Sequence, residues 1–273
     1  MGYRRSIIEL ENGLCMEQFE PAKATGKTPM LFAHGNFAGS WCFHNLLAYF
    51  AERGVASHAV NYRGHWLSGG HAELGKAVTE DYVTDVEACL RSIGREAILV
   101  GHSMGGVVGQ LTAERNRLEK LVLLDSGPCK EITETYFQPR PGMGHLLREL
   151  YEAEPDRTIR MKRNPEGIKA VFFERDKVSD ETLARTVAFL GPESSHVVQN
   201  HAFISVDPKK FSCPVYVLGR EGLGNEEKPD LWHALADYLN AKERHISGEI
   251  SHNMFMERDW EAHAARIEKW CFG

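Results

Sequence analysis

Residues 97–106 read AILVGHSMGG, and this stretch decides the fold. The run 97–100 is short, apolar and bounded by glycine, which is typical of a strand buried in a sheet. It leads into a G-x-S-x-G pattern with Ser103 at its centre, and a helix-prone segment follows. A turn this tight needs small residues beside the serine and holds the serine hydroxyl above the edge of the sheet. The pattern therefore predicts Ser103 as a nucleophile.

The alternation of strand and helix continues on both sides of this turn. Further strands are predicted at 29–33, 56–62, 121–124, 214–218 and 244–246, and helices at 41–53, 79–93 and 260–270. Such an alternation is typical of an α/β fold, in which a mostly parallel sheet is covered by helices on both faces. Ligands bind at the carboxyl ends of such strands. His34, Ser103 and Asp125 all follow strand ends and are therefore expected at one edge.

A different pattern fills the chain between the strands at 121–124 and 214–218. Charged, helix-prone segments such as 145–153 and 180–190 replace the strands there, and prolines separate them. We interpret residues 129–208 as a helical cap inserted into the sheet. The core would then consist of residues 1–128 and 209–273.

The composition favours a globular protein that acts on a small molecule. The chain is 42% hydrophobic with a formal net charge of −6, so we expect no basic surface for nucleic acid or an anionic membrane. Its six cysteines have neither the spacing of a zinc site nor that of a disulfide framework. No apolar run is long enough for a signal peptide or a membrane span. We therefore expect a soluble, cytoplasmic protein. The sequence leaves the oligomeric state open, a homo-oligomer included.

A serine hydroxyl needs a general base, and His252 is the predicted one. It follows the last predicted strand and precedes the terminal helix, and this order of serine first and histidine last is typical of enzymes with a G-x-S-x-G turn. His34, His65 and His102 belong to loop motifs, where a hydrogen-bonded structural role is expected.

Backbone N–H groups are the usual donors to the oxyanion that forms during attack on a carbonyl. We expect them from Met104, which begins the helix after the serine, and from Asn36 in the loop after the strand at 29–33. Phe37 is the alternative to Asn36. The histidines show no H-E-x-x-H or similar ligand spacing, so we expect no metal.

These motifs together resemble the α/β-hydrolase superfamily over most of the chain. They are His34-Gly35, Trp41, Arg63-Gly64-His65, the serine turn, and Ser251-His252 ahead of Trp260. The run AHGNFAGSWCFHNLLAYFAERG at 33–54 is most similar to small bacterial esterase and lysophospholipase-like hydrolases, which also resemble plant methylesterases. The resemblance implies a cofactor-free ester hydrolase with a helical lid, and it indicates fold and mechanism better than substrate.

One departure from this family concerns the acid of the catalytic triad. Many members place it in a G-x-x-D pattern after the strand that is 215–218 here, but this chain reads Gly219-Arg220-Glu221-Gly222. Some members carry the acid after the preceding strand, where this chain has Asp125. We favour Asp125, with Glu221 as the alternative. The acid is the carboxylate that hydrogen-bonds His252, because that bond fixes the histidine tautomer and stabilises the imidazolium.

The predicted function is that of a serine hydrolase that cleaves a carboxylic ester, a thioester or a lactone of a small, largely apolar substrate through an acyl-enzyme. Two alternatives on the same fold are a cofactor-independent dioxygenase of a heteroaromatic ring and a non-catalytic ligand receptor. Six side chains are predicted to contact the substrate: Phe37, His102, Tyr136, Phe137, Met143 and Phe172.

Overall fold

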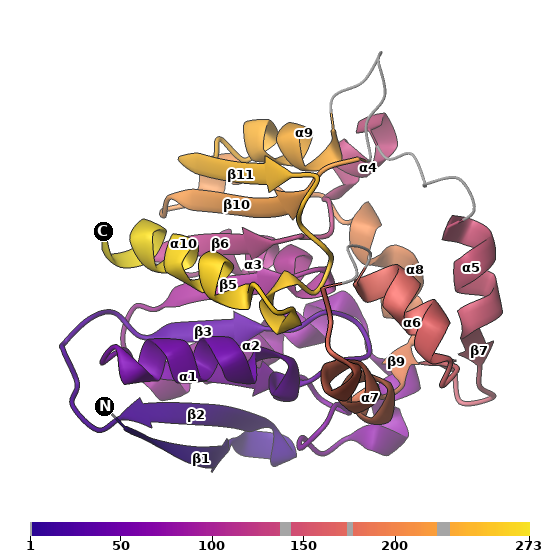
Figure 1. Ribbon diagram of the computed structural model, residues 1–273, viewed down its shortest axis with the longest axis horizontal. Coiled ribbons are helices and arrows are strands. Elements are labelled where there is room, and N and C mark those ends of the chain that lie inside the picture. Colours follow the sequence, from indigo (N-terminus) through magenta and orange to yellow (C-terminus); the bar gives the residue numbers. More distant parts are fainter. Residues whose placement is uncertain (1, 137–142, 174–176, 223–229) are drawn as a thin grey trace.

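The computed structural model describes residues 2–136, 143–173, 177–222 and 230–273, and its centre is an eight-stranded sheet (Figure 1). The order of the strands is β1-β2-β4-β3-β5-β6-β10-β11. Their bounds are β1 (Tyr3–Glu9), β2 (Cys15–Pro21), β3 (Met30–Ala33), β4 (Ser57–Asn61), β5 (Ile98–His102), β6 (Lys120–Leu124), β10 (Val215–Arg220) and β11 (Glu243–Ser247). β2 pairs antiparallel with β1 and β4, and the pairs from β4 to β11 are parallel. The predicted mostly parallel sheet is confirmed.

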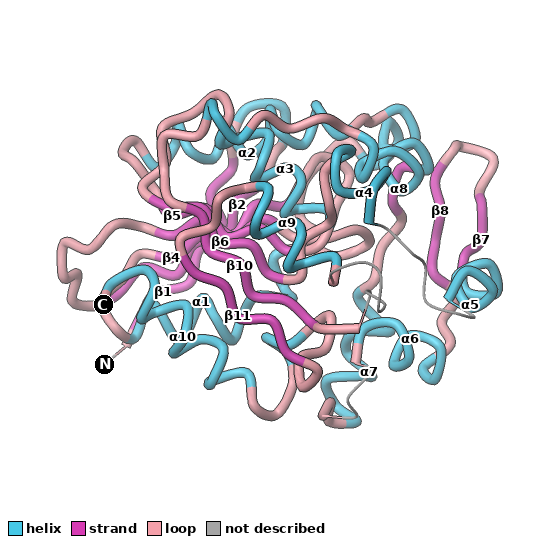
Figure 2. Tube along the Cα trace, turned by 90° about the horizontal axis from the view of Figure 1, so that it is seen from above, coloured by secondary structure: helices cyan, strands magenta, loops and turns pink. Residues whose placement is uncertain are grey.

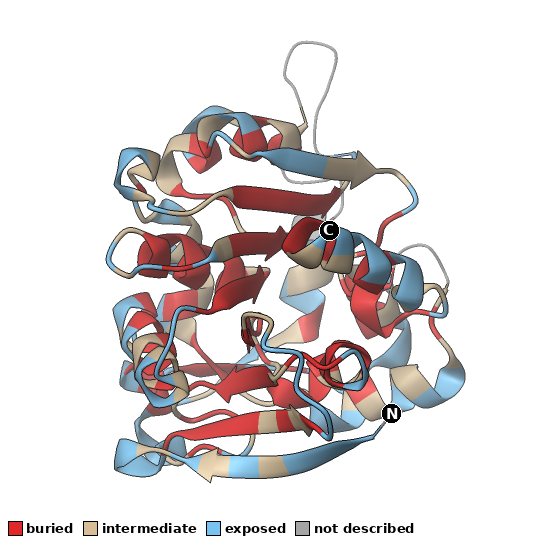
Figure 3. Ribbon diagram, turned by 90° about the vertical axis from the view of Figure 1, so that its left-hand side faces the viewer, coloured by how far each residue is buried: buried red, intermediate tan, exposed pale blue. Residues whose placement is uncertain are grey.

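Helices cover both faces of this sheet (Figure 2). One face carries α1 (His44–Glu52) and α10 (Trp260–Phe272), and the other carries α2 (Thr79–Ile93), α3 (Met104–Ala113) and α9 (Leu231–Tyr238). Successive side chains of a strand point to opposite faces, so in β5 Ile98 packs in the α1 and α10 layer and Leu99 in the other layer. Burial on both faces explains why the central strands read as continuous apolar runs. Figure 3 shows these buried strands and the more exposed outer strand β1.

The segment between β6 and β10 lies beyond the carboxyl ends of the strands (Figure 1). We call residues 129–208 the cap segment. Its helices are α4 (Lys130–Tyr136), α5 (Met143–Leu150), α6 (Pro165–Phe172), α7 (Asp180–Phe189) and α8 (Ser195–Asn200). It also contains a small antiparallel sheet of β7 (Tyr151–Ala153), β8 (Thr158–Met161) and β9 (Glu193–Ser194). The sequence did not predict this sheet, because strands this short give no recognisable alternation. The predicted boundary after residue 208 falls within the 3₁₀ helix Pro208–Lys210.

A buried carboxylate joins the N-terminal hairpin of β1 and β2 to α1. Glu17 on β2 is fully buried and accepts hydrogen bonds from Ser40 Oγ at 2.6 Å and His44 Nε2 at 3.0 Å. Arg5 on β1 adds an ion pair. Burial alone would raise the pKa of Glu17, but these hydrogen bonds and charges lower it to about 2. The carboxylate is therefore ionised inside the fold and holds the edge of the sheet against the helix layer.

Two further features of the described residues bear on the predictions from composition. Their helices are all too short or too polar to cross a lipid bilayer. The six cysteines all lie in the described ranges and are free thiols, five of them buried.

Candidate active site

The turn at Ser103 has the strained geometry that its sequence predicts. β5 ends at His102 and α3 begins at Met104, and Ser103 between them has φ 54° and ψ −124°. The flanking glycines are required by contact, because a Cβ on Gly105 would overlap the carbonyl oxygen of Ala33. The Ser103 N–H donates to Leu124 O at 3.2 Å, which holds the turn against β6.

Positive φ angles also occur at two neighbouring strand ends. Phe37 in the loop after β3 has φ 66°, and Asp125 directly after β6 has φ 40°. Such backbone costs about 1–3 kcal/mol at a non-glycine residue and persists where the surrounding structure imposes it, often at functional sites. Three strained residues at the same edge of the sheet therefore mark this edge as the candidate site.

His252 pairs with Asp125 at this edge. His252 lies in the loop after β11, and its Nδ1–H donates to Asp125 Oδ2 at 2.5 Å. The Asp125 carboxylate is completely buried. Burial alone would raise its pKa, but the charge of Arg220 and the hydrogen bond from His252 lower it. The alternative acid, Glu221, is exposed, and its N–H donates to Ser247 O at 3.1 Å.

Arg220 is a site residue that the sequence analysis did not identify. Its Nε lies 3.0 Å from Asp125 Oδ2, and its backbone N–H donates to Asp125 Oδ1 at 3.0 Å. The parallel register that pairs Leu218 with Leu124 brings these two positions together. In the sequence, Arg220 was only a basic residue in the loop where many related enzymes carry the triad acid. Its contact with Asp125 could be inferred only from the register of β10 against β6.

His102 supports the loop that carries His252. His102 is 4% exposed, and its Nε2–H donates to His252 O at 3.0 Å. Burial lowers the pKa of His102 well below its usual range, as does the neighbouring His252, so the ring is neutral. The His102 ring packs against the rings of His252 and Phe255, and the substrate contact predicted for His102 stays a prediction.

The loop after β3 lies directly against the serine. A Cβ on Gly35 would lie 2.8 Å from Ser103 Cβ, so only glycine leaves room for this approach. Asn36 follows and is partly exposed, and its Oδ1 has no hydrogen-bond partner among the described residues. On the other side of the serine, Met104 is the first residue of α3. Its N–H has no partner within the helix and lies at the positive end of the helix dipole. These positions fit the donors predicted for an oxyanion.

Apolar side chains from the cap segment meet this edge. Phe172 stacks on the His252 ring with 5.8 Å between centroids, and its carbonyl accepts a hydrogen bond from Asn253 N at 2.9 Å. The Phe37 ring lies 5.5 Å from that of Tyr151. The structure therefore brings Phe37 and Phe172 of the predicted substrate contacts to the site, together with Tyr151.

The other predicted substrate contacts are Tyr136, Phe137 and Met143. Tyr136 packs in the cluster on the α9 side of the sheet. Phe137 and the side chain of Met143 lie outside the described residues.

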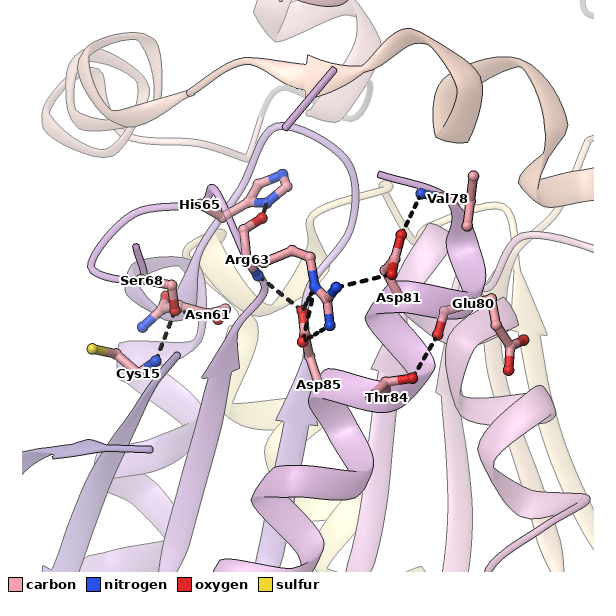
Figure 4. A network of polar contacts seen from close by, with 10 residues as sticks. All are labelled: Cys15, Asn61, Arg63, His65, Ser68, Val78, Glu80, Asp81, Thr84 and Asp85. Carbon is pink, nitrogen blue, oxygen red and sulfur yellow. Dashed lines mark hydrogen bonds and ion pairs between the residues drawn. The ribbon is translucent and has the colours of Figure 1, made fainter. Parts of the chain in front are cut away.

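The motif Arg63-Gly64-His65 connects the core to the cap segment. Arg63 forms ion pairs with Asp85 and Asp81 of α2, which hold its loop in place (Figure 4). His65 Nδ1 bonds to Arg63 O at 3.0 Å, and its Nε2 lies 3.1 Å from Glu193 Oε2 in the cap segment. Burial alone would lower the pKa of His65, but the charge of Glu193 raises it. This buried ion pair fastens the cap segment beside the candidate site.

Comparison with known proteins identifies the family. The model described as the alpha/beta hydrolase family matches residues 30–266. The chain belongs to this family. The predicted superfamily is thus confirmed.

Two known enzymes resemble parts of the chain. An sn-1-specific diacylglycerol lipase of Danio rerio is 33% identical over 116 residues, which is 40% of this chain and 35% of the lipase. A carbendazim hydrolyzing esterase of Nocardioides sp. is 35% identical over 101 residues, which is 35% of this chain and 40% of the esterase. The match thus spans well under half the length of either relative.

Solved structures show the same fold at low identity. A bacterial membrane phospholipase A has a TM-score of 0.68 at 19% identity, with 98% of this chain and 86% of that chain covered. A methylesterase from Arabidopsis has a TM-score of 0.67 at 17% identity, with 89% and 98% covered.

Proposed function

We propose that this alpha/beta hydrolase cleaves carboxylic esters through an acyl-enzyme formed on Ser103. The observation that carries the proposal is the 2.5 Å contact between His252 Nδ1 and Asp125 Oδ2 at the edge where the strained Ser103 turn lies. Because Nδ1 donates to the carboxylate, Nε2 is the nitrogen free of a proton, as a general base requires. The similarity of parts of the chain to a lipase and an esterase supports the same reaction class.

The proposed reaction has two steps. Ser103 Oγ attacks the ester carbonyl while its proton passes to His252 Nε2, and Asp125 stabilises the imidazolium. Backbone N–H groups of Met104 and of Asn36, or Phe37 in its place, hold the oxyanion. The C–O bond then breaks and the leaving alkoxide takes the proton from Nε2. A water molecule attacks the acyl-enzyme by the same route, which releases the acid and restores Ser103.

The proposed substrate has a small, largely apolar acyl group. The cap segment, proposed as residues 129–208 over a core of 1–128 and 209–273, contributes Phe172 and Tyr151 beside Phe37. Aromatic walls with few polar groups favour apolar acyl or aromatic groups. Thioesters and lactones would enter the same acyl transfer.

Two measurements test this proposal. A fluorophosphonate probe should label Ser103 rapidly, and Ser103→Ala should remove the labelling. A series of p-nitrophenyl esters of increasing chain length should then show turnover and the acyl length that the site accepts. A parent protein that neither reacts with the probe nor hydrolyses any ester would contradict the proposal and favour a ligand receptor. Oxygen uptake with hydroxyquinolones but no ester hydrolysis would favour the ring-cleaving dioxygenase.

A further inference from the structure

His252 and Arg220 share one carboxylate oxygen in this site. Asp125 Oδ2 lies 2.5 Å from His252 Nδ1 and 3.0 Å from Arg220 Nε. The other oxygen, Oδ1, accepts the backbone N–H of Arg220 at 3.0 Å. The carboxylate is completely buried, so water screens these charges weakly. Any proton gained by His252 therefore places a second positive charge beside the Arg220 guanidinium.

The Arg220 side chain is fixed in this position. It is 13% exposed, and its guanidinium lies 5.2 Å from the centre of the Trp232 ring. Trp232 is itself anchored, because its Nε1–H donates to Ser126 O at 3.1 Å. The arginine charge is thus held between an aromatic face and the carboxylate.

Among the described residues, three other titratable groups adjoin this pair. His102 reaches it from β5 and is neutral. Glu221 follows Arg220 and is exposed. Asp230, before α9, accepts hydrogen bonds from the N–H groups of Gly222 and Trp232.

We propose that Arg220 is a positioning residue that sets the pH at which His252 works as a general base. Its guanidinium neutralises part of the Asp125 charge that would otherwise stabilise the imidazolium, and it repels the imidazolium directly. His252 then stays unprotonated to lower pH than an Asp125–His252 pair without the arginine would allow. The inference rests on the proposed ester hydrolysis. It predicts activity that extends into mildly acidic solution.

The test is the pH dependence of kcat/KM for a p-nitrophenyl ester, which reports groups of the free enzyme. In Arg220→Gln the midpoint of the acidic limb should move up by about one pH unit or more, because the like charge of the arginine, which disfavours the imidazolium by about this amount at a few ångströms, is gone. Arg220→Lys, which keeps the charge, should stay close to the parent. Arg220→Met, which keeps an apolar stem over Trp232, replaces the glutamine variant should that one not fold.

Arg244→Gln is the matched control. Arg244 lies on the neighbouring strand β11 and pairs with the exposed Asp237, so this change removes the same net charge away from the site. Its acidic limb should stay in place. An unshifted limb in Arg220→Gln with a rate reduced equally at every pH would overturn the proposal, since that is the result of a merely structural role.

A second readout does not depend on activity. The His252 ring can be titrated by NMR in Ser103→Ala, with and without Arg220→Gln. The added change should raise the titration midpoint, and an unchanged midpoint refutes the role of Arg220. If the parent hydrolyses no ester, the proposed function fails, but this titration still decides the inference about Arg220.

Discussion

Asp125→Asn replaces one oxygen of the buried carboxylate by an NH₂ group, so the side chain keeps almost the same shape. The asparagine Oδ1 would keep the hydrogen bond from the backbone N–H of Arg220, which is 3.0 Å long in the parent. Its Nδ2 would then face His252 Nδ1, where the carboxylate now accepts at 2.5 Å. Because an amide nitrogen only donates, His252 Nδ1 must become the acceptor and Nε2 must carry the proton. In that tautomer Nε2 has no lone pair for the Ser103 proton.

We expect this change to lower kcat by about 10⁴-fold, the loss seen when a serine protease triad is held in the wrong tautomer. That factor corresponds to about 5.4 kcal/mol of transition-state stabilisation. KM should change little, because Asp125 is completely buried and does not contact substrate.

The assay is steady-state hydrolysis of a p-nitrophenyl ester, with circular dichroism to verify the fold. Glu221→Gln is the matched control, since it makes the same chemical change at an exposed carboxylate in the loop after β10. The control should retain the parental rate to within about threefold. If Asp125→Asn also stays within about tenfold of the parent, the reasoning is refuted, because the triad acts as a unit. A large loss in Glu221→Gln instead would assign the acid to Glu221.

Three further predictions follow from other parts of the molecule. Ser103→Ala should keep the fold and lower ester turnover by about 10⁴-fold or more, and residual activity above about a tenth of the parent would exclude Ser103 as nucleophile. Prolonged chelation should leave turnover unchanged, because backbone N–H groups rather than a Lewis acid are proposed to hold the oxyanion, and recovery of activity only on adding zinc would contradict this. Glu17 has its pKa depressed from 4.5 to about 2, so it contributes stability above pH 4.5 that is lost as the pH falls toward 2. Glu17→Gln should therefore lower the free energy of unfolding by about 3 kcal/mol near neutral pH. In urea titrations that difference should shrink below pH 4.5, and a deficit independent of pH would refute the assignment.

The central strands and the serine turn were predictable because their local sequence is unambiguous. The run 97–100 is apolar on both faces, and the glycines around Ser103 mark a turn that leaves no room for a larger residue. The hairpin of β1 and β2 was not predicted. Its strands carry charged residues such as Arg5 and Glu17, and their partners come from distant parts of the chain. Those partners make Glu17 a buried residue, which no local pattern shows.

In the candidate site, the sequence could indicate only those residues whose type and place at a strand end suggest a role. Asp125 and Glu221 were both suitable in the sequence, because the choice depends on which loop turns toward His252. Arg220 required the parallel register of β10 against β6, a relation between segments about 95 residues apart. For His102 the sequence indicated a structural role and a substrate contact, but only the fold shows that its Nε2–H supports the His252 loop.

The attachment of the cap segment has a consequence for how new specificities can arise on this scaffold. Phe172 O accepts from Asn253 N at 2.9 Å beside His252, and Gly191 N donates to Phe37 O at 2.8 Å in the loop beside Ser103. These are main-chain bonds, so exchange of the whole cap for that of a relative would leave the loops of His252 and Phe37 without these partners unless the new backbone followed the same path. Side chains such as Tyr151 can change without that cost. A directed-evolution library confined to cap side chains that face the site therefore yields variants with altered substrate preference. In a library of grafted caps, most variants must first regain the main-chain bonds that hold the site together.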